Sequence, residues 1–416
     1  MKLPTATLAA AALVCACSAP DGQAAQNTPA QSRASSAAPL EDAAPNAPAQ
    51  KPAFAGQTRA PGLPAGHAYK TEVVARDLDH PWSLAYLPDG RLLISERAGR
   101  LRLLDTSGRL GTITGLPPVD ARDQGGLLGL AVDPEFPRNS LIYFSFAERK
   151  GDLTHTAVGC GRLVSTADGG RLEDVRIIFR QTPSMASTKH YGGRLLFRPD
   201  GTLFVTLGER SILEGRAQAR QPDSHLGKIV RITREGQAPA DNPFIGKAGV
   251  LPEIWSSGHR NVQAAALDPR TGDLWEVEHG ARGGDELNRV QAGRDYGWPT
   301  ISYGVEYSGR PIGEGLTQRP GLEQPVYYWD PVIGPSGMAF YQGDAFPQWN
   351  GSLLVGSLTK GRLVRLVLDG DRVTGEAHLL EDVDERIRDV AVAPDGTVLV
   401  ATDSPRGRVI RILPEG

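Results

Sequence analysis

The chain has 416 residues and a formal net charge of −3 at pH 7, with 49 glycines and 32 prolines. This length suits one large all-β domain, and the near-neutral charge argues against nucleic acid or an anionic membrane surface as the main partner. Beyond the N-terminal region, no segment approaches the ~20 apolar residues that a membrane-spanning helix needs.

The N-terminus has the features of a bacterial lipoprotein signal. Residues 8–14 form an apolar stretch of signal-peptide length. Cys17 follows a small residue, as in a lipobox, and Cys15 is the alternative acceptor of the lipid. An ordinary secretory signal with incidental cysteines would explain the pattern less well. We therefore predict a signal peptide over residues 1–17 and a periplasmic lipoprotein, with Ser18 favouring the outer membrane.

The next region differs in composition from the rest of the chain. Residues 18–66 are rich in Ala, Pro, Gln and Ser and hold few large apolar side chains. Such a segment cannot bury a core, which predicts a disordered tether. Ordered structure is expected to begin near Tyr69, within one domain over residues 67–416. Cys160 is the only cysteine of that domain, so no intrachain disulfide is expected.

A unit of apolar strands joined by a turn of Pro, Asp or Gly recurs through the remaining chain. Its six copies begin at residues 82–86, 128–132, 195–197, 262–267, 337–341 and 389–393. Six small antiparallel sheets predict an all-β, six-bladed β-propeller with four-stranded blades, whereas a β-sandwich explains neither the copies nor the repeated turn. Residues 69–78 should pair into the last blade and close the ring. Copies three to five carry long polar loops, which predicts a functional site on one face.

The third copy contains a candidate catalytic pair. The turn Pro199-Asp200-Gly201 joins two short strands into a hairpin. His190 precedes the first strand and Glu209 follows the second, so the hairpin should make them neighbours. A carboxylate beside an imidazole fixes its tautomer and raises its basicity, as in a general base. The alternative is a surface His and a surface Glu at strand ends.

Further polar segments flank innermost strands and should meet at the central mouth of the ring. They are residues 123–128, 255–261, 278–288 and 385–389. Arg386 and Arg388 lie two apart on an extended segment and share a face, which suits a ligand with planar carboxylates. The loop at residues 280–286 can offer the hard oxygen ligands that Ca²⁺ prefers. No Cys/His spacing supports zinc, and no phosphate-binding glycine motif supports a nicotinamide cofactor.

These motifs, taken in order, resemble the soluble pyrroloquinoline quinone (PQQ)-dependent aldose sugar dehydrogenases, a glucose/sorbosone dehydrogenase-like family. The resemblance covers residues 82–412. It rests on Gln124-Gly125-Gly126-Leu127-Leu128, His190-Tyr191-Gly192-Gly193-Arg194-Leu195, Gly258-His259-Arg260-Asn261, Glu278-His279-Gly280 with Asp285-Glu286, Tyr296-Gly297-Trp298-Pro299 and Arg386-Ile387-Arg388-Asp389. It implies a six-bladed propeller that uses PQQ and Ca²⁺ to oxidise aldoses at the anomeric carbon to aldonolactones.

The resemblance also implies roles for single residues. His190 matches the catalytic base, Glu209 the acid that orients it, and Arg260 a residue beside the reactive quinone carbonyl. The implied PQQ contacts are Gln124, Arg260, Asn261, Tyr307, Gly334, Pro335, Ser336, Arg386 and Arg388. Where the family has a cofactor-binding Lys, this chain has Thr359 and then Lys360, so that contact shifts or changes.

Calcium ligands are implied in the same way. The backbone carbonyls of Gly280 and Ala281 match the two that hold the catalytic Ca²⁺. Glu286 and Tyr296 resemble ligands of a second, structural Ca²⁺.

Two other classes of protein remain as alternatives. A calcium-dependent propeller hydrolase, such as a lactonase, would not need the paired arginines Arg386 and Arg388. A non-catalytic binding propeller would need neither the His190–Glu209 pair nor the metal loop. For the dehydrogenase, the expected partners are an aldose and an electron acceptor. The sequence leaves the preferred sugar open, and also whether the protein is a monomer or a homodimer.

Overall fold

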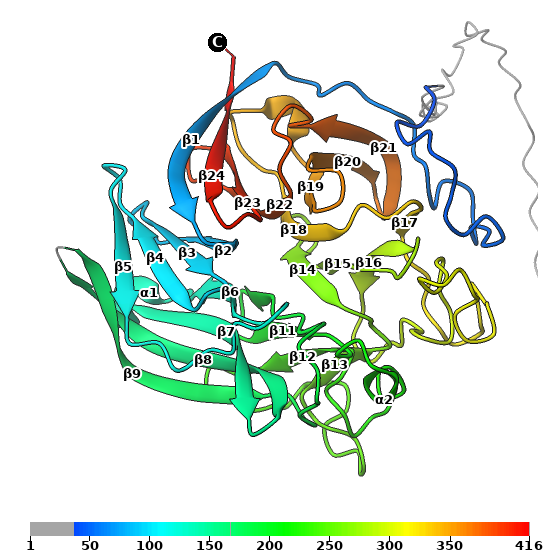
Figure 1. Ribbon diagram of the computed structural model, residues 1–416, viewed down its shortest axis with the longest axis horizontal. Coiled ribbons are helices and arrows are strands. Elements are labelled where there is room, and N and C mark those ends of the chain that lie inside the picture. The colour runs from blue at the N-terminus through cyan, green and yellow to red at the C-terminus, as the bar shows by residue number, and fades with distance from the viewer. Residues whose placement is uncertain (1–36, 167, 416) are drawn as a thin grey trace, which may run out of the picture. The chain divides into compact units, whose positions relative to one another are not determined.

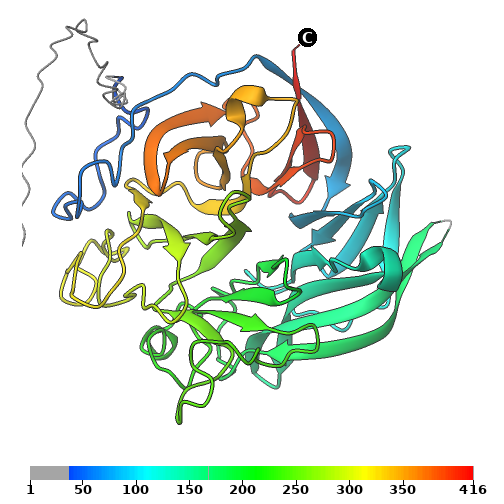
Figure 2. The same ribbon diagram turned by 180° about the vertical axis from the view of Figure 1, so that it is seen from behind.

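A computed structural model describes residues 37–166 and 168–415 (Figures 1 and 2). The predicted signal peptide and residues 18–36 of the predicted tether lie outside the described residues. Strands dominate the described part. Its helical segments are short: α1 (Phe136–Asn139), α2 (Leu213–Arg216) and a 3-10 turn at Pro347–Trp349. The all-β prediction is confirmed. Within the described ranges, no helix has the length and apolar character needed to cross a membrane.

Four sheets each contain four strands, in the orders β1-β24-β23-β22, β10-β11-β12-β13, β14-β15-β16-β17 and β18-β19-β20-β21. Their strands are β1 (Tyr69–Leu78), β10 (Leu195–Phe197), β11 (Leu203–Leu207), β12 (Lys228–Ile232), β13 (Ile254–Ser257), β14 (Val262–Leu267), β15 (Leu274–Glu278), β16 (Asp285–Val290), β17 (Tyr327–Trp329), β18 (Pro335–Phe340), β19 (Leu353–Ser357), β20 (Leu363–Asp369), β21 (Arg372–Leu379), β22 (Ile387–Val392), β23 (Val398–Thr402) and β24 (Gly407–Pro414).

A fifth sheet has eight strands in the order β2-β3-β4-β5-β9-β8-β7-β6. These strands are β2 (Pro81–Tyr86), β3 (Leu92–Glu96), β4 (Arg100–Leu104), β5 (Leu110–Thr114), β6 (Leu127–Val132), β7 (Leu141–Lys150), β8 (Leu153–Thr166) and β9 (Gly169–Arg180). The sheet is continuous because β5 pairs with β9 in parallel, with Thr112 opposite Gly169. The structure therefore has five sheets where the sequence predicted six separate ones.

The sheets are arranged around a common centre (Figure 1). Strands β2, β6, β10, β14, β18 and β22 each lie beside the next in this order, and β22 lies beside β2. As predicted, β1 pairs with β24, so the N-terminal strand completes the sheet that carries the last copy. Middle strands such as β11 and β19 are buried along their whole length because neighbouring sheets cover both faces. This arrangement directs the loops that flank the inner strands toward one region.

Residues 37–66 form an ordered segment, which we call the N-terminal strap. The Tyr328 amide donates to the Gln57 carbonyl, the Leu63 amide donates to the Glu376 carbonyl, and the Gln57 side chain is fully buried. The prediction of a disordered tether is therefore wrong for residues 37–66. Backbone hydrogen bonds to β17 and β21 supply the order that the segment's few apolar side chains could not supply alone.

Candidate active site

The hairpin of β10 and β11 places His190 beside Glu209. His190 Nδ1 lies 2.8 Å from Glu209 Oε1, and both side chains are buried. The His190 backbone has a φ of +49°, a strained conformation that is common at functional sites, and its amide donates to Gln124 Oε1 at 2.9 Å. Gly192 is required nearby because a Cβ there would lie 2.6 Å from the Thr206 carbonyl oxygen. The predicted neighbourhood of His190 and Glu209 is confirmed.

Burial sets the protonation of this pair. Burial, and then the charges of nearby arginines led by Arg260, lower the pKa of His190 well below its usual value. Burial raises the pKa of Glu209 to about 7, although Arg260 opposes the rise. The imidazole is therefore neutral near pH 7. Its Nε2 has no hydrogen-bond partner within residues 37–166 and 168–415, so it is free to accept a proton.

Arg260 and Asn261 are held beside the pair by a buried carboxylate. Glu278 Oε2 accepts the amides of Arg260 and Asn261 at 2.5 and 3.2 Å. Asn261 Oδ1 in turn accepts the Gly192 amide at 3.2 Å. These hydrogen bonds connect the motif at residues 258–261 to the hairpin. Glu278 is a positioning residue; the sequence analysis placed it in a motif but gave it no role.

A cavity of about 120 Å³ lies next to this hairpin: Tyr191 and Gly192, which follow His190 in the chain, line it, whereas His190 itself does not. Its lining comes from several sheets and comprises Trp82, Arg97, Gln124, Leu128, Tyr191, Gly192, Asn261, Gln263, His279, Leu358, Arg386 and Arg388. None of these lining residues is acidic. The Nε atoms of Arg97 and Arg388 are buried and, among the described residues, have no hydrogen-bond partner. A cavity lined by three arginines and no carboxylate suits a ligand with several carboxylates, which is the character of PQQ.

The two arginines of the predicted carboxylate clamp share one anchor. Asp403 Oδ2 accepts Arg388 Nη2 at 2.8 Å and Arg386 Nη2 at 3.3 Å. Although burial opposes its ionisation, Arg388 holds the pKa of Asp403 well below its usual value. Arg388 also donates to Gln263 Oε1 at 3.1 Å. Asp403 and Gln263 orient the clamp, and the sequence analysis missed both because Asp403 follows β23 and Gln263 lies on β14, far from the clamp in the sequence.

A second buried carboxylate organises the loop at residues 333–336. Asp285 Oδ2 accepts the Ile333 and Gly334 amides at 2.8 and 2.7 Å, and its Oδ1 accepts the Gly280 amide at 2.8 Å. Burial raises the pKa of Asp285 to about 6, although these amides oppose the rise. Asp285 thus links the predicted cofactor loop to the predicted metal loop.

The remaining predicted cofactor contacts lie outside the lining of the cavity. Ser336 Oγ donates to the Ile387 carbonyl at 2.7 Å, and Pro335 accepts a hydrogen bond from the imidazole of His279, which lines the cavity. Tyr307 is 70% exposed, with its hydroxyl 3.3 Å from Arg260 Nη2. Lys360 is not among the lining residues, and its Nζ lies 3.7 Å from Glu41 Oε2.

Thr359 also lies outside the cavity lining. Its amide donates to the Ile333 carbonyl at 3.0 Å, so it packs behind the loop at residues 333–336.

Three of the four predicted metal ligands line a small cavity of about 10 Å³, room for one water-sized particle. Gly280, Glu286 and Tyr296 line it together with Glu278, whereas Ala281 does not. The Gly280 carbonyl accepts Arg260 Nη1 at 2.5 Å. The Tyr296 hydroxyl donates to the Arg289 carbonyl and accepts the Gln291 amide, which leaves the backbone carbonyl of Tyr296 as the group available to a cation.

Excess negative charge is buried around this small cavity. Burial, and then the neighbouring Glu278, raise the pKa values of both Glu276 and Glu286 well above the usual value. Glu276, Glu278 and His259 bring potential ligand atoms within 4.8 Å of one another, and Glu276 Oε2 has no hydrogen-bond partner among the described residues. This surplus of unpaired carboxylate oxygen fits a hard cation such as Ca²⁺.

Comparisons with known proteins agree with the motifs. The family described as Glucose / Sorbosone dehydrogenase matches residues 78–411. The chain is 43% identical over 347 residues to the aldose sugar dehydrogenase YliI of Escherichia coli, covering 82% of this chain and 92% of that protein.

Solved structures show the same similarity. The E. coli soluble aldose sugar dehydrogenase in its apo form has a TM-score of 0.79 at 42% identity, covering 84% of this chain and 100% of that one. The PQQ-bound aldose sugar dehydrogenase of Streptomyces coelicolor has a TM-score of 0.68 at 28% identity, covering 85% and 100%. The resemblance drawn from the motifs is confirmed: the chain belongs to the glucose/sorbosone dehydrogenase family.

Proposed function

We propose that the protein is a PQQ- and calcium-dependent aldose dehydrogenase that oxidises sugars at the anomeric carbon to aldonolactones. The observation that carries this proposal is the buried His190–Glu209 pair, whose chain neighbours Tyr191 and Gly192 line a cavity that three arginines also line. The names of two relatives support it: the quinoprotein glucose dehydrogenase B of Acinetobacter calcoaceticus and the PQQ-bound Streptomyces enzyme. An external electron acceptor completes the cycle.

We also infer that the domain is a six-bladed propeller. The eight-stranded sheet then comprises two blades, β2–β5 and β6–β9, joined through the parallel β5–β9 pair. The ring of six inner strands supports this interpretation. Because β5 and β9, the outer strands of the two blades, pair with each other, neither leaves an open edge that could pair with another chain.

The residues of this chain would act on the sugar as follows. Arg386, Arg388 and Gln124 would hold PQQ, which when bound supplies the acceptor for the hydride from the anomeric carbon. With Glu209 ionised, His190 keeps its proton on Nδ1, so Nε2 takes the proton from the anomeric hydroxyl. Glu209 then stabilises the imidazolium, and Arg260 places a positive charge beside the reacting atoms.

This mechanism predicts a pH dependence that is due to Glu209. Its pKa is raised to about 7, so the carboxylate that supports the imidazolium forms as the pH rises through that value. The lowered pKa of His190 keeps the base neutral over the same range. The rate of anaerobic PQQ reduction by sugar should therefore rise between about pH 6 and 8. The inflection should disappear in Glu209→Gln, and an unchanged inflection there would contradict the assignment.

Calcium should stabilise the folded protein before any cofactor is added. We propose that Glu286 and the Tyr296 carbonyl bind a structural Ca²⁺, and that the Gly280 and Ala281 carbonyls bind a catalytic one. Calcium at about a hundred times its Kd should add about 2.7 kcal/mol to the free energy of unfolding of chelator-treated protein. Glu286→Gln should lose much of this gain, whereas Glu72→Gln, on the exposed part of β1, should keep it. An equal response of all three proteins in calorimetry would exclude a site at Glu286.

We propose that the protein is periplasmic and anchored to the outer membrane by lipid. The support is the lipobox-like sequence around Cys17, with Cys15 as the alternative. Fatty-acid labelling that persists in Cys15→Ser/Cys17→Ser would contradict the anchor.

One spectrum separates this function from the two alternatives. Wild-type protein titrated with PQQ in the presence of Ca²⁺ should show a saturable absorbance change. A lactonase or a non-catalytic binding propeller has no need of the arginine-lined cavity and should show no change. Hydrolysis of a lactone without PQQ would favour the lactonase.

A further inference from the structure

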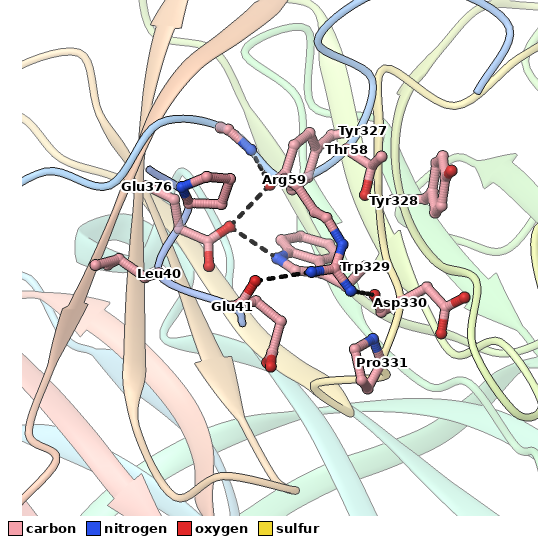
Figure 3. Close-up of a pocket in the computed structure, with 12 residues that line it drawn as sticks. Leu40, Glu41, Thr58, Arg59, Tyr327, Tyr328, Trp329, Asp330, Pro331 and Glu376 are labelled. Carbon is pink, nitrogen blue, oxygen red and sulfur yellow. Dashed lines mark hydrogen bonds between the residues drawn. The ribbon is translucent and has the colours of Figure 1, made fainter. Parts of the chain in front are cut away.

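The N-terminal strap lies outside residues 78–411, the range of the family match. Figure 3 shows it packed against the segment that leads into the loop at residues 333–336, which contains the predicted cofactor contacts Gly334, Pro335 and Ser336. Trp329 Nε1 and the Tyr327 hydroxyl both donate to Glu376 Oε2, and the Tyr327 hydroxyl accepts the Ala60 amide at 2.9 Å. The strap, β17 and β21 therefore form one hydrogen-bonded unit.

The strap forms hydrogen bonds with Asp330, which precedes the loop at residues 333–336. The amides of Asn46 and Ala47 donate to the two carboxylate oxygens of Asp330 at 2.7 and 2.9 Å. Arg59 Nη2 donates to the Asp330 carbonyl at 2.9 Å. Asp330 is buried, so these contacts fix the chain three residues before Ile333.

The strap also reaches the other side of the same loop. Glu41 Oε2 lies 3.7 Å from both Lys360 Nζ and Arg362 Nη2. Residues just before Lys360 support the loop from behind, since Ser357 Oγ donates to the Ile333 carbonyl at 2.7 Å and the Leu358 amide to the Gly334 carbonyl at 2.9 Å. The loop is thus held between two segments that the strap contacts.

Arg59 joins the two contacts. Its Nη1 donates to the Glu41 carbonyl at 2.8 Å, while its Nη2 reaches Asp330. One side chain therefore sets the spacing between the part of the strap that touches Asp330 and the part that touches Lys360.

We propose that the N-terminal strap is a positioning element for the cofactor site, bracing the loop at residues 333–336 from both sides. The brace keeps the Ile333 and Gly334 amides on Asp285, whose other oxygen holds Gly280. The effect on the cofactor rests on the proposed PQQ function. The effect on the loop does not, because it concerns the protein without ligand.

Hydrogen exchange on the full chain without cofactor tests the brace. Arg59→Ala and Glu41→Gln each remove one side of it, and Asp330→Ala removes the acceptor of both strap amides. The Ile333 and Gly334 amides should exchange about tenfold faster in each folded variant. Lys51→Ala is the matched control, because Lys51 is exposed and its side chain donates to the Pro48 carbonyl within the strap. Thermal unfolding of each variant verifies its fold.

Cofactor titration then links the brace to the site. The Kd for PQQ should rise about tenfold in Arg59→Ala and stay unchanged in Lys51→Ala. Faster exchange confined to residues 37–66, with unaltered exchange at Ile333 and Gly334 and an unaltered Kd, would overturn the proposal. Failure of the wild-type protein to bind PQQ would instead count against the proposed function and leave the exchange result to decide the brace.

Discussion

Replacing His190 with Gln should slow the anaerobic reduction of bound PQQ by an aldose at least ~10²–10⁴-fold, the usual effect of losing a positioned general base. Cofactor binding should persist, because the paired arginines lie on another strand. Glu209→Gln should slow the reduction less. The Gln side chain can still accept a hydrogen bond from His190 Nδ1, but it lacks the charge that stabilises the imidazolium. The measurement is single-turnover reduction at full PQQ occupancy.

A second His–Glu pair provides the matched control. His155 is buried, and its Nε2 lies 2.6 Å from Glu148 Oε2, but its Nδ1 lies 3.0 Å from Ser184 Oγ and no chain neighbour of His155 lines the cavity. His155→Gln should therefore reduce PQQ at nearly the wild-type rate. Near wild-type reduction in His190→Gln would remove His190 from the role of base.

Removing either clamp arginine should weaken PQQ binding by about 1.5–3 kcal/mol, as for the loss of a charge-assisted hydrogen bond. Arg388→Ala should have the larger effect, because Arg388 is buried whereas the Arg386 side chain is 54% exposed. Equilibrium titration with PQQ measures both.

The control for the clamp is Arg406→Ala. The Arg406 side chain is 86% exposed and lies between β23 and β24 of the same sheet. Its removal should leave the affinity unchanged. Equal affinities in wild type, Arg386→Ala and Arg388→Ala would show that the clamp does not hold the cofactor.

The strands and the catalytic hairpin were predictable because their signals are local. The turn at residues 199–201 separates two apolar runs, and the structure pairs Leu195 with Val205 and Phe197 with Leu203. Register within a hairpin follows from its turn, so the meeting of His190 and Glu209 follows from a stretch of about twenty residues.

The pairing of β5 with β9 could not be predicted in this way. The strands Leu110–Thr114 and Gly169–Arg180 are joined by no turn, and they pair only after the strands on either side of them have assembled into one sheet. The ordered structure of the N-terminal strap was unpredictable for the same reason. It depends on hydrogen bonds to β17 and β21, which the composition of the strap does not indicate.

The candidate active site also combines features that local sequence predicts with features that depend on the folded structure. Its motifs could be found in the sequence, but the positioning role of its buried carboxylates could not, even for Asp285, which stands in one of the motifs. Asp403 contacts Arg388 from the end of the neighbouring strand β23, and Asp285 reaches Gly334, 49 residues away, only after the sheets have assembled. Lys360 was predicted from its place in a motif, and its position beside Glu41 depends on the strap.

The central claim is tested most directly by adding an aldose to the wild-type protein loaded with PQQ and Ca²⁺ in the absence of oxygen. The account predicts that the absorbance of the bound quinone changes to that of the reduced form, with one equivalent of aldonolactone formed per site. An unchanged spectrum across a panel of aldoses, with PQQ shown to be bound, would contradict it.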